Sequence, residues 1–588
     1  MGPMRTFPRP KREPDGRGEK TALAVGLFLF AAFFGLTRTG TGFTIAYLRP
    51  FSYSPPGESY FWLASALLLF PAACLLGYGL APWLGPKIGR AWSRAEGLNK
   101  RQSSLSLAAL LVLTTAIAGL SHLLVLRGTP ITDDENGARF GGQVLAMGRV
   151  KVPAPEPADI FPSLFLYSRG GTTTSVDWPG SQAAWALAEA TRAGPWVFAL
   201  FAGAAALAVA WAAGLLLSPG YGLAAFLLFL LSPMAFTLSA TTHAHVVSRG
   251  LIALTLLFYV RAERGENPGR WALTGLAAAA AFTVRPIETT FLFLPLGASF
   301  VLRERRTAEG RRRLGAFALG AAGPVVLFAV HNAVVTGNAF LPARFYMEGP
   351  AEAFFKGSLW DRFGANTSYN LFMLAVWFLG PLGLIAVAAG VRANRLTRIL
   401  GLGVLAMLLV GLFHDNHGLH IVGPIHYSEC AVPLTLIAVH GLAKVKDFFA
   451  RAGLRPERFA AVILGPLLLG LGVFNLWEAL ALNRQARIQT TIYGAIEKGV
   501  AAGGVQGRAV VLVPKYADAW QGHPPFEEIG SWLFDWRRAR PDLADRILLV
   551  RDLPGAGAAM RARFPDRPQF RLTLVDRPPY FVVEGVPD

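Results

Sequence analysis

The stretch LSLAALLVLTTAIAGLSHLLVLRGTPITDDE, from Leu105 to Glu135, decides the fold class that the sequence predicts. Its first part, Leu105 to Leu126, contains no Lys, Arg, Asp or Glu, and it is as long as the ~20 residues that a helix needs to cross a bilayer. Arg127 ends the apolar run, and three adjacent carboxylates follow at Asp133, Asp134 and Glu135. We therefore expect a transmembrane helix that leaves the bilayer beside an acidic loop.

The composition of the whole chain is also typical of a membrane protein. Its 588 residues are 53% hydrophobic and only 16% charged, with a mean hydropathy of +0.41, whereas soluble proteins carry roughly 25% charged residues. The formal net charge is +19, which would suggest nucleic acid in a soluble chain. In a membrane protein, Lys and Arg instead gather in short cytoplasmic loops, so we expect no nucleic-acid partner. The cysteines, Cys74 and Cys430, are too few for a disulfide framework.

Apolar runs along the chain predict about 13 transmembrane helices. They are expected at residues 21–47, 60–84, 105–126, 195–217, 221–239, 246–260, 271–284, 289–302, 314–335, 371–391, 399–413, 429–442 and 459–482. Lys and Arg then fall in alternate loops, which predicts an integral inner (plasma) membrane protein with a cytoplasmic N-terminus and an extracytoplasmic C-terminus. Some runs are shorter than ~17 residues, so re-entrant segments or short paired helices are alternatives there.

The topology divides the chain into four predicted parts. Residues 1–20 form a basic cytoplasmic tail, and residues 21–104 an additional N-terminal transmembrane hairpin with an inner loop rich in Lys and Arg from Lys87. Residues 105–482 form the main transmembrane domain, with outer loops at 127–194 and 336–370. The remaining residues, 483–588, have a different composition and are expected to form a small soluble domain on the extracytoplasmic face.

This C-terminal part has the pattern of an α/β domain. Strands are predicted at Ala509–Val513, Ile547–Val550 and Phe581–Val583, with a helical stretch at Phe526–Arg540 between them. The predicted fold is therefore an all-α polytopic membrane protein with a small C-terminal α/β extracytoplasmic domain. No internal repeat supports an inverted-repeat transporter.

The acidic triplet Asp133–Glu135 lies on the predicted outer side, directly after a membrane helix. Three adjacent carboxylates repel one another. Such a group can bind a cation, act as a general base on a hydroxyl or amine, or simply solvate a loop. The spacing alone leaves these alternatives open.

Histidines are concentrated on the same predicted side. The group comprises His243, His245, His414, His417, His420 and His426, beside Asp415 and Glu429. A single histidine there would usually bond to backbone or lipid headgroups, but six are more typical of a shared polar cavity. A metal held with the acidic triplet is an alternative, although neither His243-x-His245 nor His414–His420 has the spacing of a strong metal motif.

Arginines at the predicted outer face suggest a site for an anion. Arg285-Pro286-x-Glu288 lies between two apolar runs, where a guanidinium is costly unless it is paired. Either Arg285 forms an ion pair with Glu288, or it binds an anionic headgroup through its planar set of donors. The following outer loop adds an aromatic and basic mixture, comprising Arg344, Tyr346, Glu348, Lys356, Trp360 and Arg362, which suits the membrane interface or a sugar phosphate.

Four motifs in this order resemble a known family. They are Asp134-Glu135 followed by Phe140 and Gly148-Arg149, then Thr283-Val284-Arg285-Pro286, then Asn332 to Phe340, and then Gly423-Pro424-Ile425-His426-Tyr427 followed by Glu429 and Pro433. Together with an outer domain after the last helix, they resemble the GT-C superfamily of polyprenyl-phosphate-sugar-dependent glycosyltransferases. The resemblance is greatest to the protein O-mannosyltransferase and lipid A aminoarabinose transferase branch.

The chain departs from the family pattern at three places. Ala339 stands where proline is usual, and His426 stands where arginine is usual. His243 and His245 occupy the outer end of a mid-chain helix, where the family often has an acidic residue. These differences leave open the donor sugar and any metal requirement.

The resemblance implies an inverting transfer of a sugar from a polyprenyl-phosphate donor to an extracytoplasmic glycan, lipid or protein acceptor. It implies that Asp134 is the general base, with Asp133 the alternative because the doubled Asp leaves the register open by one. Arg285 would bind the donor phosphate, with Arg139, Arg344 and His426 as helpers. Glu135 is the third implied catalytic residue and would orient substrate hydroxyls. The remaining implied substrate-binding residues are His243, His245, Glu288, Tyr427 and Glu429. No cofactor is required by this chemistry, and a divalent metal is the open alternative.

Two other classes of protein are compatible with parts of the pattern. A transporter or lipid flippase would line a pathway with carboxylates and arginines, but it should carry ionisable residues at mid-membrane in several helices, and few are found. An assembly or sensor protein would use the C-terminal domain to bind a partner, which leaves the acidic triplet unexplained.

Overall fold

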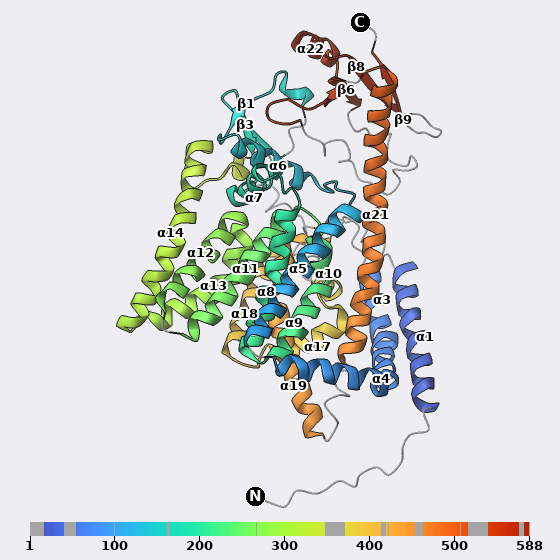
Figure 1. The fold of residues 1–588 in the computed structure, drawn as a ribbon, viewed down its shortest axis with the longest axis vertical. Coiled ribbons are helices and arrows are strands. Elements are labelled where there is room, and N and C mark those ends of the chain that lie inside the picture. Colours follow the sequence, from blue (N-terminus) through green and yellow to red (C-terminus); the bar gives the residue numbers. More distant parts are fainter. Residues whose placement is uncertain are drawn as a thin grey trace, which may run out of the picture. The chain divides into compact units, whose positions relative to one another are not determined.

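The structure is a computed structural model, and it describes residues 17–39, 55–98, 100–161, 165–265, 267–346, 371–412, 419–420, 423–452, 463–505, 507–514, 539–574 and 581–586. The chain divides into two compact units (Figure 1). The first combines Met1–Gly97 with Lys444–Gly470, and the second combines Leu98–Ala443 with Leu471–Asp588. The second unit contains every predicted site residue.

The first unit is built mainly from N-terminal helices. They are α1 (Arg17–Thr39), α3 (Pro55–Ala64), a π-helical segment (Ser65–Leu69) and α4 (Phe70–Glu96). Phe33 of α1 packs against Phe61 of α3, and both rings are buried. The sequence predicts an inner loop from Lys87, whereas α4 continues through Pro82 and Pro86 to Glu96 and is capped by Gly97.

The second unit contains a bundle of apolar helices. The helices are α5 (Lys100–Leu124), α8 (Trp196–Leu216), α9 (Pro219–Leu231), α10 (Pro233–Ser239), α11 (Ala244–Glu263), α12 (Pro268–Val284), α13 (Pro286–Glu304), α14 (Ala308–Thr336), α17 (Gly380–Gly390), α18 (Arg395–Gly411) and most of α19 (Ala431–Arg451) and α21 (Gly465–Ala502). The end of α19 from Lys444 and the start of α21 up to Gly470 belong to the first unit. α8 packs against α5, α9 and α11 (Figure 1). Gly250 of α11 is required at this contact, because a Cβ there would lie 2.8 Å from the carbonyl oxygen of Phe201.

Within the described residues, eight helices are long and apolar enough to cross a membrane, or up to ten if each of two bent helix pairs is one span. The bent pairs are α9 with α10, at 62°, and residues 371–377 with α17, at 104°. The chain is therefore an integral membrane protein. The predicted spans at 271–284, 289–302 and 399–413 form the helices α12, α13 and α18, which are not among the eight.

The segment between α5 and α8 has its own small fold. It contains α6 (Asp133–Ala146), β1 (Val152–Pro153), a short 3-10 turn (Ala158–Ile160), β2 (Leu166–Arg169), β3 (Thr172–Ser175) and α7 (Pro179–Ala190). The strands form an antiparallel sheet in the order β1-β3-β2, and α6 packs against α7. α7 begins at a proline, as do α9, α12 and α13, because proline at the first helical position needs no hydrogen-bond donor.

The C-terminal residues form a mixed four-stranded sheet at the end of α21. The strands β6 (Ala509–Pro514), β7 (Ile547–Asp552), β8 (Gln569–Leu574) and β9 (Phe581–Gly585) lie in the order β7-β6-β8-β9. β6 runs parallel to β7 and β8, and β9 is antiparallel to β8. The helix α22 (Ala556–Arg563) precedes β8.

Strands occur at the three predicted C-terminal positions, whereas the sequence did not predict β8 or α22. Of the predicted helical stretch Phe526–Arg540, only Ala539 and Arg540 are described, and they are not helical. One face of the sheet packs on Ile496 and Val500 of α21. The other face packs on α22 and on Ile160 and Phe161 of the segment after α6.

Candidate active site

The N-terminus of α6 is held by Glu135, the third residue of the predicted acidic triplet. Thr132 is the N-cap of the helix, and Glu135 completes a capping box with it. Glu135 Oε2 accepts hydrogen bonds from the amides of Ile131 and Thr132, at 2.9 and 3.2 Å. Its Oε1 accepts from the amide and the hydroxyl of Thr242, at 2.7 and 2.6 Å. The carboxylate is 1% exposed, so Glu135 anchors α6 to the turn between α10 and α11.

His243 belongs to the same anchor. Its Nε2 lies 2.7 Å from the hydroxyl of Thr132, and the ring is buried. His243 is the N-cap residue of α11. Two of the predicted site residues, Glu135 and His243, therefore fix the position of the acidic helix start.

Asp134 is the second residue of α6 and is partly buried. The side chain of Asp133 lies outside the described atoms. Asp177, which the sequence analysis did not identify, lies beside them on the turn between β3 and α7. A Cβ on Gly137 would lie 3.0 Å from Asp177 Oδ2, and Gly137 follows Asp134 by three residues, on the same side of the helix. The structure thus brings a second carboxylate to the start of α6.

Burial raises the pKa of Asp177 to about 6, and the nearby charge of Asp134 adds to this rise. Arg344 acts in the opposite direction, with Nη1 3.7 Å from Asp177 Oδ1. The hydroxyl of Ser175 donates to Asp177 Oδ2 at 3.2 Å, and Gln182 donates to its carbonyl oxygen at 2.6 Å. The carboxyl is therefore held by Ser175 and Arg344, and Gln182 holds the backbone of the same residue.

Arg285 lies at the junction of α12 and α13, as the sequence predicts. Its Nε donates to Glu288 Oε1 at 2.9 Å, and its Nη2 bonds to the same oxygen and lies 3.1 Å from Nδ1 of His426. The ion pair of Arg285 with Glu288 is therefore confirmed. Nδ1 of His426 also lies 3.5 Å from Glu288 Oε1, so the tautomer of His426 decides which of the two partners it bonds to.

The turn that carries Asp177 lies close to this junction. α7 contacts α12, and a Cβ on Gly180 would lie 2.5 Å from the hydroxyl of Thr283. The charges of Asp134 and Glu429 act on Arg285 along with that of Glu288. Arg285, Glu288 and His426 are called the Arg285 cluster below. The start of α6 and this cluster therefore form one polar region.

His245 and Glu429 form a buried pair beside His426. Nδ1 of His245 lies 2.9 and 3.1 Å from the two carboxylate oxygens of Glu429, and the hydroxyl of Ser428 donates to Glu429 Oε2 at 2.9 Å. The side chains of His245 and Glu429 are 2% and 0% exposed. The carboxylate of Glu429 therefore holds the proton of His245 on Nδ1.

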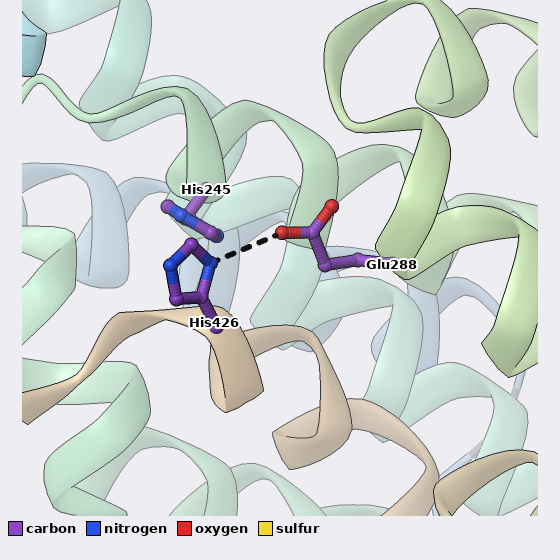
Figure 2. A group of neighbouring side chains, drawn as sticks. All are labelled: His245, Glu288 and His426. Atoms are coloured by element: carbon purple, nitrogen blue, oxygen red, sulfur yellow. Dashed lines mark ion pairs between the residues drawn. The ribbon is translucent and has the colours of Figure 1, made fainter. Parts of the chain in front are cut away.

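His245, Glu288 and His426 could offer ligands to a metal ion. One ligand atom from each lies within 4.8 Å of the others, and Figure 2 shows their side chains converging from three separate segments. However, the guanidinium of Arg285 already donates to Glu288 and His426. A divalent cation at the same atoms would be repelled by this positive charge. Two of the three candidate metal ligands are thus already bonded to Arg285.

Three further residues predicted for the site are not part of the hydrogen-bonded groups described above. Nε of Arg139 donates to Glu189 of α7 at 3.1 Å, and its side chain is 48% exposed. Tyr427 is buried beside the Glu429 pair. Tyr346 packs on Tyr167, with ring centroids 5.7 Å apart.

Several predicted positions fall outside the described residues, namely His414, Asp415, His417, Glu348, Lys356, Trp360 and Arg362. His420 lies in a two-residue strand, and its side chain is not described. Three polar residues of the site were missed in the sequence, namely Asp177, Thr242 and Ser428. The one usable signal was the position of Asp177, directly before the Trp178-Pro179 helix start.

No protein-family model and no curated protein sequence matches the chain. Among solved structures, its fold is that of the GT-C membrane glycosyltransferases. The apo crystal structure of ArnT from Cupriavidus metallidurans matches with a TM-score of 0.50 at 12% identity, over 82% of this chain and 98% of ArnT. The GT-C resemblance predicted from the sequence is thus confirmed for the fold.

Two other solved structures match less closely. ArnT from the same organism bound to undecaprenyl phosphate has a TM-score of 0.49 at 13% identity, over 81% of this chain and 97% of ArnT. The arabinofuranosyltransferase AftD from Mycobacteria has a TM-score of 0.41 at 15% identity, over 82% of this chain and 36% of AftD.

Proposed function

We propose that this chain is a membrane glycosyltransferase that moves a sugar from a polyprenyl-phosphate donor to an extracytoplasmic acceptor, with inversion at the anomeric carbon. The observation that carries the proposal is the turn of Asp177, which adjoins the start of α6 with Asp134 and contacts the end of α12 next to Arg285, within a GT-C fold. A base for the acceptor and a cation for a phosphate leaving group are the two main demands of this reaction. The proposed orientation rests on the alternation of Lys and Arg between loops.

Asp134 is the proposed general base. It removes a proton from the acceptor hydroxyl or amine, whose oxygen or nitrogen attacks the anomeric carbon of the donor sugar. The bond between that carbon and the phosphate oxygen breaks, and polyprenyl phosphate leaves with the electron pair. A single displacement of this kind inverts the anomeric carbon. Asp133, the adjacent residue, is the alternative base.

Arg285 is the proposed partner of the donor phosphate. Its five N–H donors allow it to hold Glu288 and His426 and still donate to a phosphate oxygen. The ion pair with Glu288 offsets the cost of keeping the guanidinium in a buried site before the donor binds. Arg344 is the proposed second cation, because Asp177 already directs it toward the start of α6.

His245 and His426 are proposed to orient sugar or acceptor hydroxyls. Glu429 fixes the orientation of His245, and Arg285 and Glu288 fix that of His426. Glu135 and His243 act on the substrate only indirectly in this proposal, by positioning α6.

Purified variants can test these assignments with a labelled polyprenyl-phosphate sugar and a cell-envelope acceptor fraction. Asp134→Asn should abolish transfer without changing the amount of folded protein, and Arg285→Ala should raise the apparent KM for the donor severely. An active Asp134→Asn variant together with an inactive Asp133→Asn variant would reassign the base. An unchanged donor KM in Arg285→Ala would refute the phosphate role.

A further inference from the structure

A cavity of about 230 Å³ lies between the segment that follows α5 and the C-terminal sheet. On one side it is lined by Phe140 of α6, by Phe161 and by Leu166 of β2. On the other side it is lined by Arg540 and Asp542, which precede β7, and by Arg563 at the end of α22. None of the residues that line the cavity belongs to the Arg285 cluster.

The two walls of the cavity are joined by a buried apolar contact and an exposed hydrogen bond. Phe161 is 4% exposed and packs with Ile160 against the apolar residues of β6 and β7. Nη1 of Arg563 donates to the carbonyl oxygen of Glu156 in the segment after β1. The cavity is therefore bounded by packed elements on both sides.

The charged residues at the cavity are held in fixed orientations. Nε of Arg540 donates to Asp542 Oδ1 at 3.1 Å, and its Nη2 donates to Oδ2 at 3.4 Å. This two-point pairing fixes the plane of the guanidinium. The bond from Arg563 to Glu156 uses Nη1, and a guanidinium has five N–H donors in all. Planar donors and a carboxylate acceptor thus lie opposite two aromatic rings.

We propose that this cavity binds a saccharide unit of the acceptor, an assignment that rests on the proposed glycosyl transfer. The apolar face of a sugar ring would contact Phe140 and Phe161, and its hydroxyl or carboxylate groups would bond to Arg540, Asp542 and Arg563. A pocket with few placed polar groups on an otherwise apolar lining is typical of small-molecule sites. A prenyl tail would not use the two arginines and the carboxylate.

The position of the cavity along α6 fits an acceptor site. Phe140 follows Asp134 by six residues on the same helix, which is about 9 Å along the helix axis. The proposed base and the cavity therefore share one rigid element. A saccharide in the cavity would lie about 9 Å along α6 from Asp134 and on another side of the helix, so that a further unit of the same acceptor chain would have to extend to the base.

Binding can be measured without donor, by saturation-transfer NMR on the full-length protein in detergent. The probes are methyl glucoside and methyl glucuronide. We expect at least one probe to bind wild type, and we expect Arg540→Ala and Arg563→Ala each to weaken its binding at least tenfold. Arg571→Ala is the matched control, because Arg571 lies on β8, pairs with Asp552 and does not line the cavity. Arg563 is exposed at the surface, so its loss should leave the fold intact.

Transfer kinetics then separate this proposal from the proposed function. A bound probe should inhibit transfer competitively against the acceptor and not against the donor. If neither probe binds wild type, or if both arginine variants bind as wild type does, the saccharide site is refuted. If the probe binds as expected but wild type transfers no sugar, the proposed transferase function fails and the cavity stands as a saccharide site of another kind.

Discussion

The role of Glu135 as an anchor leads to a prediction that separates positioning from catalysis. Glu135 and Asp134 are adjacent acidic residues at the start of α6, and both were candidate catalytic groups in the sequence. In the structure, Glu135 accepts hydrogen bonds at both carboxylate oxygens. Replacing Glu135 with Gln keeps the shape of the side chain but exchanges one acceptor for an NH₂ donor.

The amide group that Glu135→Gln introduces cannot satisfy these partners in either orientation. With its nitrogen in the place of Oε1 it would face the amide N–H of Thr242, and after a flip it would face the amides of Ile131 and Thr132. At least one buried N–H group then loses its acceptor. A hydrogen bond to a charged group contributes about 1.5–3 kcal/mol, and leaving a buried donor unpaired costs about 1–3 kcal/mol. We expect a loss of about 3 kcal/mol at this contact.

Hydrogen exchange measures this contact directly. Amide exchange in the peptides that contain Thr132 and Thr242 should be about 100-fold faster in Glu135→Gln than in wild type, since about 1.4 kcal/mol corresponds to a factor of ten. Transfer should also fall, because α6 is no longer fixed. Asp134→Asn, the adjacent control with the same change of charge, should lose transfer with wild-type exchange. Unchanged exchange in Glu135→Gln together with loss of transfer would refute the anchoring role and assign Glu135 to the chemistry.

Three further predictions concern neighbouring residues. Asp177 has a pKa of about 6 in the folded protein, above that of an unfolded Asp. The contribution of Asp177 to the free energy of unfolding is therefore full below pH 4 and is lost as the pH rises through 6. The melting temperature of wild type relative to that of Asp177→Asn should fall between pH 4 and pH 7. A difference in melting temperature that does not change with pH would contradict the burial of Asp177. Gly137→Ala should reduce transfer more than tenfold, because the new Cβ would lie 2.8 Å from Phe165 Cβ and 3.0 Å from Asp177 Oδ2. Gly315→Ala on α14, with open space at its Cβ, is the control and should be as active as wild type. Equal activities of the two variants would show that the close approach at Gly137 is not needed. Glu429→Gln should lower stability by about 3–5 kcal/mol, measured by denaturant unfolding in detergent, because it breaks a buried pair; a wild-type midpoint would rule out an ionised pair.

The class of fold could be predicted because it depends on long-range composition. Runs such as Leu105–Leu126 are recognisable by length and hydropathy alone. The number of spans could not be predicted as securely, because bends depend on local packing. Residues 221–239 form a single apolar run, yet Ser232 and Pro233 divide it into two helices bent by 62°.

The candidate site was predictable in its charged residues but not in their contacts. Arg285 and Glu288 are three residues apart at a helix start, so their pairing follows from the sequence. By contrast, Glu429 pairs with His245, which is 184 residues away, and Glu135 bonds to Thr242, which is 107 residues away. No spacing rule connects such residues, because the packing of separate helices brings them together. For the same reason the sequence could not separate the anchoring role of Glu135 from the proposed chemical role of Asp134.

One measurement tests the central proposal most directly. Purified wild-type protein in liposomes is given undecaprenyl phosphate linked to a radiolabelled sugar, together with an envelope acceptor fraction. We predict that label passes to an acid-stable product and that one undecaprenyl phosphate is released for each sugar transferred, with neither change in Asp134→Asn. Movement of the intact lipid-linked sugar between leaflets, without cleavage and at equal rates in both proteins, would contradict a glycosyltransferase and favour a flippase.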